Sequence, residues 1–257
     1  MKKILSTLLI LVLSVFSYSK VLKVGVTPVP HTAFLELIKD DLKKEGIDLE
    51  IVEFNEYVIP NIALADKELD ANYFQHLPYL TKFSEERKLN LTSLGTVHIA
   101  PLALYSNKYS SLNEIPNGSS VAIPNDPSNL GRSLILLHLN GVIKLKDPND
   151  WFATEFDVID NPKKIKFKPV EAPQLPRVLK DVDAAVIPGN FAIQNNLNPV
   201  KNGLIREDKN SPYANVIAVR KGDENREDIK TLFKILRSEK LKKFIADEYD
   251  GGVIPAF

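Results

Sequence analysis

The sequence predicts an α/β protein built from two lobes with a ligand cleft between them. Strand-like and helix-like segments alternate along the first half of the chain, and the alternation returns in the second half. A length of 257 residues suffices for one large core or two smaller ones. Two strand-like segments, residues 97–106 and 214–220, are suited to cross between the lobes. Paired crossings are typical of a hinged clamp that holds its ligand in the cleft.

The first half of the chain has a β-α-β-α order. Phe34, Ile38 and Leu42 fall on one helical face, and Gly46 is a suitable helix end. This order favours a largely parallel sheet. The expected elements are strands at residues 21–28 and 47–54 and helices at residues 31–46 and 58–71.

The second half repeats the pattern and ends in a long amphipathic helix, whose apolar stripe begins at Leu232, Ile235 and Leu236. Its expected strands are residues 92–106, 119–126, 164–172, 183–189 and 213–222, and its helices are residues 128–141 and 227–249. We therefore assign residues 20–105 and 216–257 to lobe I and residues 106–215 to lobe II.

The first nineteen residues are predicted to be a signal peptide. Lys2 and Lys3 precede an apolar run at residues 4–16, which is shorter than a membrane span, and cleavage is expected after Ser19. The chain contains no cysteine, which argues against disulfides, thiol chemistry and a lipid anchor on a cysteine. We therefore expect a periplasmic protein that is secreted through a cleaved signal peptide and is not lipidated.

Composition and motifs argue against two classes of function. Lys plus Arg and Asp plus Glu both number 33, so no basic excess points to nucleic acid. The chain has no Gly-x-Ser-x-Gly, no phosphate-binding loop and no Gly-x-Gly-x-x-Gly. No pair of carboxylates stands out either, and we expect no enzymatic activity.

One helix start has the features of an anion site. In "NDPSNLGRSL", Asp126, Ser128 and Asn129 are good capping residues, and free N–H groups at a helix N-terminus attract anions. Arg132 follows in the first turns, and its planar fork is able to bind a carboxylate at two points. The alternative is a capped helix with a solvated arginine.

Further polar candidates follow predicted strands. Asn190 comes after an apolar strand and Asn215 lies at the start of another, although loop asparagines are usually turn formers. His31, His76 and His98 fall near predicted strand ends, so zinc binding is a possible alternative, but their spacing matches no metal motif. The segment "ANYFQHLPYL" at residues 71–80 is dense in aromatic groups, which fits either core or pocket wall.

Several long motifs carry a family resemblance. The segments "VGVTPVPH", "LDANYFQHLPYL", "AIPNDPSNLGRSLILLHLNGVIKLKD", "DVDAAVIPGNFA", "SPYANVIAVR" and "GGVIPAF" occur in the order seen in the NlpA/MetQ family. The likeness runs from about Lys23 to Phe257. Members of this family are substrate-binding proteins of methionine-uptake ABC transporters.

The resemblance implies a two-lobe periplasmic-binding-protein fold that closes on L-methionine or a close relative. It implies no cofactor, a monomer, and a permease with its ATPase as partners. The ligand carboxylate would meet Arg132, assisted by Asn190 and Asn215. The apolar side chain of the ligand would lie among four residues, namely Tyr73, Phe74, His76 and His98.

The sequence also departs from the family pattern. Many members carry a lipid-bearing cysteine that this chain lacks. Ala100 stands where members often have an acidic residue, and Pro188 and Phe191 stand where asparagine and tyrosine are common. These changes flank the expected cleft, so D-methionine, a methionine-containing dipeptide and another apolar amino acid stay open as ligands.

Overall fold

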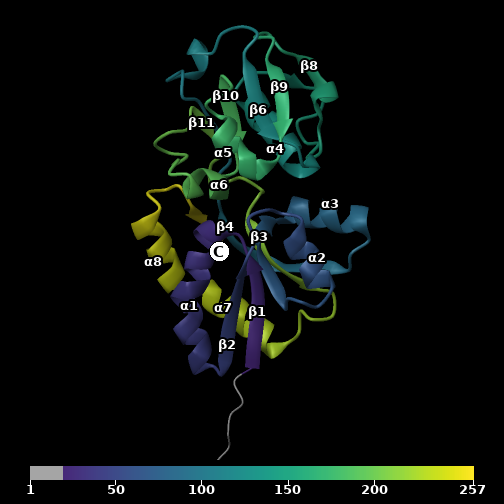
Figure 1. The fold of residues 1–257 in the computed structure, drawn as a ribbon, viewed down its shortest axis with the longest axis vertical. Coiled ribbons are helices and arrows are strands. Elements are labelled where there is room, and N and C mark those ends of the chain that lie inside the picture. The colour runs from purple at the N-terminus through teal and green to yellow at the C-terminus, as the bar shows by residue number, and fades with distance from the viewer. Residues whose placement is uncertain (1–19) are drawn as a thin grey trace, which may run out of the picture.

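The structure, a computed structural model, describes residues 20–257 and has the two-lobe α/β arrangement that the sequence predicts. Figure 1 shows the lobes one above the other, with both ends of the described chain in lobe I. The predicted signal peptide, residues 1–19, lies outside the described residues.

Lobe I is built on a mixed six-stranded sheet in the order β13-β4-β12-β3-β1-β2. β1 is parallel to β2 and β3, whereas β12 is antiparallel to β3 and β4. Its strands are β1 (Lys20–Val26), β2 (Ile47–Glu53), β3 (Ala71–His76), β4 (Leu91–Ile99), β12 (Asn215–Arg220) and β13 (Ile254–Pro255). Its helices are the irregular turn η1 (Pro28–Thr32), α1 (Ala33–Lys44), α2 (Ile59–Ala65), α3 (Leu77–Arg87), α7 (Glu227–Leu236) and α8 (Glu239–Glu248).

Helices cover both faces of this sheet (Figure 1). On one face, α1 buries the predicted stripe of Phe34, Ile38 and Leu42 against the strands, and α7 and α8 add their buried residues to the same core. On the other face, α2 and α3 pack over a smaller apolar cluster. β12 serves both cores, because Ile217 faces the first and Val216 the second. This alternation follows from the two-residue period of a strand.

Lobe II holds a five-stranded sheet in the order β11-β5-β10-β6-β9 and a small ribbon, β7-β8. Its strands are β5 (Ala103–Tyr105), β6 (Ser120–Pro124), β7 (Lys144–Leu145), β8 (Val158–Asp160), β9 (Lys166–Val170), β10 (Ala184–Ile187) and β11 (Ile205–Arg206). Its helices are α4 (Pro127–Leu139), α5 (Leu175–Val178) and α6 (Gly189–Gln194), with the short turns η2 (Leu112–Glu114), η3 (Glu155–Asp157) and η4 (Ala172–Gln174).

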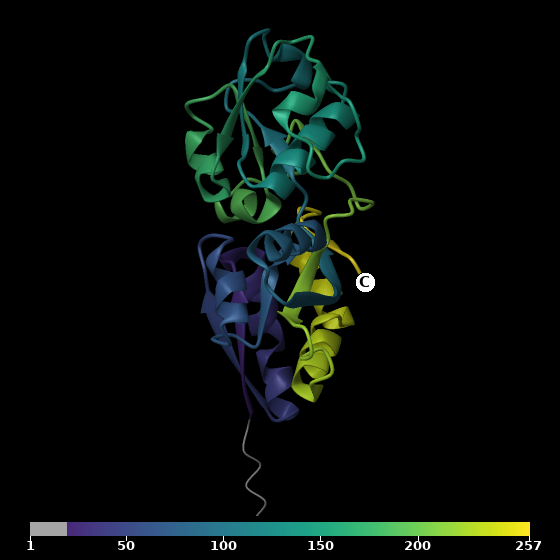
Figure 2. The same ribbon diagram turned by 90° about the vertical axis from the view of Figure 1, so that its right-hand side faces the viewer.

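The chain passes between the lobes at residues 100–102 and 207–214, and Figure 2 shows the narrow waist at this level. The expected continuous strand at residues 92–106 was wrong. Pro101 lacks an N–H and interrupts it, so β4 stays in lobe I and β5 pairs with β10 and β11 in lobe II. By sheet membership, residues 103–105 thus lie in lobe II rather than in lobe I as assigned, and Asn215 begins a lobe I strand.

The expected single helix at residues 227–249 was also wrong. It is divided at Arg237 and Ser238 into α7 and α8. The hydroxyl of Ser238 accepts a hydrogen bond from the backbone N–H of Leu241 at 3.4 Å and so caps a new helix. The apolar stripe continues across the break, because Leu236 and Leu241 are both fully buried.

Candidate functional site

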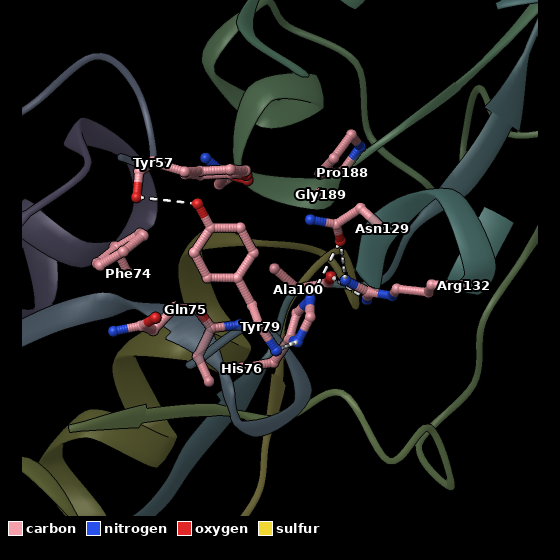
Figure 3. Close-up of a pocket in the computed structure, with 12 residues that line it drawn as sticks. Tyr57, Phe74, Gln75, His76, Tyr79, Ala100, Asn129, Arg132, Pro188 and Gly189 are labelled. Atoms are coloured by element: carbon pink, nitrogen blue, oxygen red, sulfur yellow. Dashed lines mark hydrogen bonds between the residues drawn. The ribbon is translucent and has the colours of Figure 1, made fainter. Parts of the chain in front are cut away.

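A cavity lies between the lobes at the carboxyl end of β3. Its empty space amounts to about 350 Å³, which includes space open to solvent between the lobes. In Figure 3, Tyr57, Phe74 and Tyr79 lie on one side of it, and Asn129 and Arg132 lie on the other. The lining residues are Tyr57, Phe74, Gln75, His76, Tyr79, Ala100, Asn129, Arg132, Pro188, Gly189, Asn190 and Asn215.

Lobe I supplies the aromatic wall of the cavity. The ring of Tyr57 lies 5.7 Å from those of Phe74 and Tyr79, between centroids, and 5.0 Å from that of Phe191 in lobe II. The Tyr79 hydroxyl donates to the backbone oxygen of Tyr57 at 3.1 Å and fixes the two rings relative to each other. Such rings form a surface suited to a polarisable apolar group.

His76 ends β3 and connects the lobes. Its Nδ1 accepts from the backbone N–H of Tyr79 at 3.2 Å and caps α3. Its Nε2 lies 3.1 Å from the side-chain oxygen of Asn129 on α4. Burial lowers the pKa of His76 to about 3, with the Arg132 charge as a further cause, so the ring is neutral near pH 7. A neutral ring has one N–H, which Nε2 therefore donates across the cleft.

The predicted helix start at residues 126–132 lies at the cavity. Asp126 caps α4 by accepting from the backbone N–H of Asn129 at 2.9 Å, and burial raises the pKa of its carboxyl. The side-chain amide of Asn129 also donates to Asp126, at 3.0 and 3.1 Å. The Asn129 oxygen therefore faces the Nε2 of His76 and the Nη1 of Arg132, which lies 3.4 Å away.

Arg132 is buried and already paired with a carboxylate that the sequence did not indicate. Its Nε donates to Glu207 Oε1 at 2.7 Å, and its Nη2 donates to Oε2 at 2.5 Å. Nη2 also lies 3.3 Å from the carbonyl oxygen of Ala100, and the Tyr213 ring covers the guanidinium at 4.6 Å. Burial is the largest single influence and acts to lower the pKa of Arg132, but the charge and the hydrogen bonds of Glu207, with Tyr213 and Tyr57, together raise it. Among residues 20–257, Nη1 is hydrogen-bonded only to Asn129, so it retains donor capacity toward the cavity.

The two predicted asparagines both line the cavity, one from each lobe. The Asn190 oxygen accepts from the Tyr57 hydroxyl at 2.6 Å, a second direct bond between lobes. The amide nitrogen of Asn190 is buried and has no hydrogen-bond partner within residues 20–257. The Asn215 oxygen lies 3.0 Å from Nε2 of His31, behind the cavity wall. Both residues thus have amide donors to offer a ligand.

Five predicted site residues lie at this cavity, namely Phe74, His76, Arg132, Asn190 and Asn215. Tyr73 and His98 do not line it; they are fully buried in lobe I, where the Tyr73 hydroxyl is hydrogen-bonded to Nδ1 of His98. Tyr73 and Phe74 are neighbours in β3 and therefore face opposite sides of the sheet. Assigning both to one pocket ignored this alternation.

Other lining residues were not predicted to be site residues. Tyr57 follows the parallel strand β2, so its place at a carboxyl end was a usable signal. Asn129 was expected only as a helix cap, and Tyr79 belonged to a segment that fitted either core or pocket wall. Glu207 gave no local signal, because it lies 75 residues from Arg132 in the sequence.

The three histidines of the zinc alternative are not gathered around one point. His31 and His98 lie side by side, with ring centroids 5.1 Å apart, but both ring nitrogens of His31 are hydrogen-bonded to other groups. Within residues 20–257, no three histidine, cysteine or acidic side chains are arranged to hold a metal ion. Over the same residues, none of the helices combines the length and the apolar character needed to cross a bilayer.

Comparisons with known proteins agree with this architecture. The sequence model of the NlpA lipoprotein family matches residues 22–257. The probable D-methionine-binding lipoprotein MetQ of Pasteurella multocida is 45% identical over 212 residues, which are 82% of this chain and 77% of that protein. The methionine-binding lipoprotein MetQ of Bacillus subtilis is 42% identical over 245 residues, 93% of this chain and 89% of that protein.

A solved structure gives the same result in three dimensions. The nutrient-binding protein of Burkholderia cenocepacia, determined bound to methionine, superimposes with a TM-score of 0.89. It is 43% identical to this chain, and the match covers 92% of this chain and all of that one. The predicted two-lobe binding-protein fold is thereby confirmed.

These comparisons overturn the expected localisation. We expected a periplasmic protein that is not lipidated, but the matching family is one of lipoproteins, and the curated relatives are named lipoproteins. That expectation rested on the absence of cysteine from these 257 residues. The absence of one residue type was too narrow a basis for it.

Proposed function

Because the chain belongs to the NlpA lipoprotein family, we propose that it is the substrate-binding component of an ABC importer for methionine or a closely related amino acid. The observation that carries this proposal is the cavity itself. A wall of aromatic rings from lobe I faces a buried guanidinium and amide donors from lobe II. An amino acid with a soft apolar side chain has complementary chemistry at its two ends.

The ligand carboxylate is assigned to Arg132 and its neighbours. Glu207 occupies the Nε side of the guanidinium, so the carboxylate would approach Nη1. The unpartnered amide nitrogen of Asn190 supports this placement, because a buried donor without an acceptor is unfavourable until a ligand supplies one. Together, these groups would compensate a charge that loses its water when the lobes close.

The side chain of the ligand is assigned to the rings of Tyr57, Phe74 and Tyr79. A thioether packs favourably against aromatic edges, which favours methionine over an aliphatic side chain of similar size. His76 would form the border between the two ends of the site. D-methionine and short methionine-containing peptides satisfy the same contacts in part, and the Pasteurella relative is named for the D form.

The partners follow from the same proposal. A substrate-binding component delivers its ligand to a permease, and an associated ATPase drives transport. The binding protein itself then needs neither a cofactor nor a catalytic group, which agrees with the lack of enzyme motifs in the sequence.

Two measurements test the proposal. Mass spectrometry of small molecules released by denaturing the purified protein should detect methionine or a close relative. Calorimetry of ligand-free protein with L-methionine should give a one-to-one complex and a raised melting temperature, because a ligand that binds only the native state stabilises it. D-methionine in a parallel titration ranks the enantiomers. Heat with zinc and none with either enantiomer would overturn the proposal in favour of the metal alternative.

A further inference from the structure

His31 lies directly behind the cavity wall, and both of its ring nitrogens are engaged. It belongs to the turn η1 between β1 and α1 and is fully buried, as is Thr27. Nδ1 lies 2.9 Å from the Thr27 hydroxyl oxygen, and Nε2 lies 3.0 Å from the side-chain oxygen of Asn215. The three side chains thus form a hydrogen-bonded chain that ends at a cavity-lining amide.

The direction of this chain follows from the nature of its last acceptor. An amide oxygen accepts hydrogen bonds only, so Nε2 of His31 must carry the proton. Burial lowers the pKa of His31 to about 4, and the ring is neutral at pH 7 with a single N–H. With the proton on Nε2, Nδ1 accepts from the Thr27 hydroxyl, whereas the hydrogen bonds with Asn215 and with the Thr27 backbone act to raise the pKa against burial. The protons therefore point from Thr27 through His31 to Asn215.

Aromatic neighbours prevent the imidazole from turning. The rings of Tyr73 and His98 meet it edge to face, with centroids 4.9 and 5.1 Å away. A rotated ring would break both hydrogen bonds and leave buried polar atoms without partners, which is unfavourable by about 1–3 kcal/mol for each group. The orientation of the Asn215 amide is thereby determined by groups that do not line the cavity.

We propose that His31 is a positioning residue for ligand recognition, which holds the oxygen of Asn215 away from the cavity and directs its amide nitrogen toward the ligand. This nitrogen has no acceptor among residues 20–257, so it is available to donate to a carboxylate. An asparagine free to flip would also present its oxygen there, which repels a carboxylate. The inference rests on the proposed function only for the identity of the ligand.

A double-mutant cycle with L-methionine as the probe tests the role. His31→Leu removes the donor to Asn215 and should weaken binding roughly tenfold, the size of one lost hydrogen bond to a buried group. In the Asn215→Ala background the same substitution should have no further effect, because no amide is left to orient. His31→Gln keeps an N–H at a similar reach and should restore most of the affinity. His138→Gln, on α4 and outside the cavity lining, controls for the loss of a histidine.

A measurement on the unmodified protein keeps the inference testable if the leucine variant does not fold or L-methionine does not bind. Two-bond nitrogen-15 correlation spectra of labelled protein should show His31 as the Nε2–H tautomer at pH 7. The Nδ1–H tautomer would overturn the inference, and so would an equal loss of affinity in both Asn215 backgrounds. Absence of L-methionine binding combined with the Nε2–H tautomer would refute the proposed ligand and leave the positioning role supported.

Discussion

The two walls of the cavity are chemically unlike. Among the lining residues, every aromatic ring, namely Tyr57, Phe74, His76 and Tyr79, belongs to lobe I. The full charge at the site, Arg132, belongs to lobe II and is balanced by Glu207 at the crossing. Lobe I therefore contributes the apolar surface of the cavity, with the Asn215 amide at its edge, and lobe II contributes the charge. Neither half forms a complete site alone, which couples ligand capture to the approach of the lobes.

The walls are joined by two hydrogen bonds of the same kind. Tyr57 donates to the oxygen of Asn190, and His76 donates to the oxygen of Asn129. In both cases a ring of lobe I donates to an amide of lobe II. Both bonds lie at the cavity, so part of what holds the lobes together also orients the ligand-facing groups. Other contacts between the lobes, such as those of Asn198 with Tyr249 and of Lys201 with Asp250, involve no lining residue.

The largest effect is expected from removing the charge of lobe II. Arg132→Ala should weaken binding of L-methionine by about 2–5 kcal/mol, measured by calorimetry, because a buried charge pair between protein and ligand is lost. The substitution should also lower the unfolding free energy, since Glu207 would lose its charged partner and keep only the backbone N–H of Leu102.

A second substitution separates these two consequences. Arg132→Ala combined with Glu207→Gln removes the orphaned charge and should recover stability without recovering affinity. A loss of affinity under about 0.5 kcal/mol in the single variant would show that the polar end of the site lies elsewhere.

The ring wall should make the stability of the protein depend on pH through His76. Burial lowers the pKa of His76 to about 3, whereas an unfolded histidine titrates near 6.5. As the pH falls from 7 to 5, the unfolded chain takes up a proton that the native ring refuses, so stability decreases. Wild type should therefore lose about 2 kcal/mol more of its unfolding free energy over this interval than His76→Gln does, at about 1.4 kcal/mol per pH unit below 6.5. Parallel losses in the two proteins, measured by denaturant titration, would mean that His76 is protonated in the native state.

Gly189 in lobe II lies close to the crossing segment because a glycine has no side chain. A Cβ at Gly189 would lie 2.7 Å from the carbonyl carbon of Ala100 and 2.8 Å from the oxygen of Pro101. Both are backbone atoms, so Gly189→Ala should reduce the unfolding free energy by about 1–3 kcal/mol and weaken the ligand as the walls shift. Unchanged stability in a thermal melt would show that the crossing adapts freely.

The smallest effect is expected from one hydroxyl group. Tyr57→Phe removes the bond to Asn190 between the lobes and should weaken binding by about 1 kcal/mol. Tyr79→Phe removes a bond of similar kind inside lobe I and serves as the matched control. It should affect stability but leave affinity within about twofold. Equal losses of affinity in the two variants would contradict a specific role for the bond between lobes.

The sequence predicted the parts of the molecule that follow from local pattern. The stripe of Phe34, Ile38 and Leu42, the capped start of α4 and the two-lobe order were readable from spacing and residue type. Contacts between residues far apart in the sequence were not readable in this way. Glu207 meets Arg132, and Tyr57 meets Asn190 at a separation of 133 residues, and no local period encodes such contacts.

Tyr73 and His98 were predicted to contact the ligand, and this error has a different cause. The family likeness indicated the correct strand, but the two-residue period of β3 decides which side chains reach the cavity. Tyr73 lies on the core side with His98, and both pack around His31. Two of the residues predicted to touch the ligand, Tyr73 and His98, thus lie behind the cavity and support the residues that line it.

The environment of Trp151 gives the molecule an optical property. It is the one tryptophan of the chain. Its ring lies 6.3 Å from that of Tyr213, and the Tyr213 ring in turn contacts His76 at 5.1 Å and the Arg132 guanidinium at 4.6 Å. The indole is therefore two contacts away from the charge at the polar end of the cavity. Its emission, excited without any attached dye, should change when a ligand carboxylate reaches the Arg132 guanidinium, so the protein carries its own fluorescent reporter of occupancy.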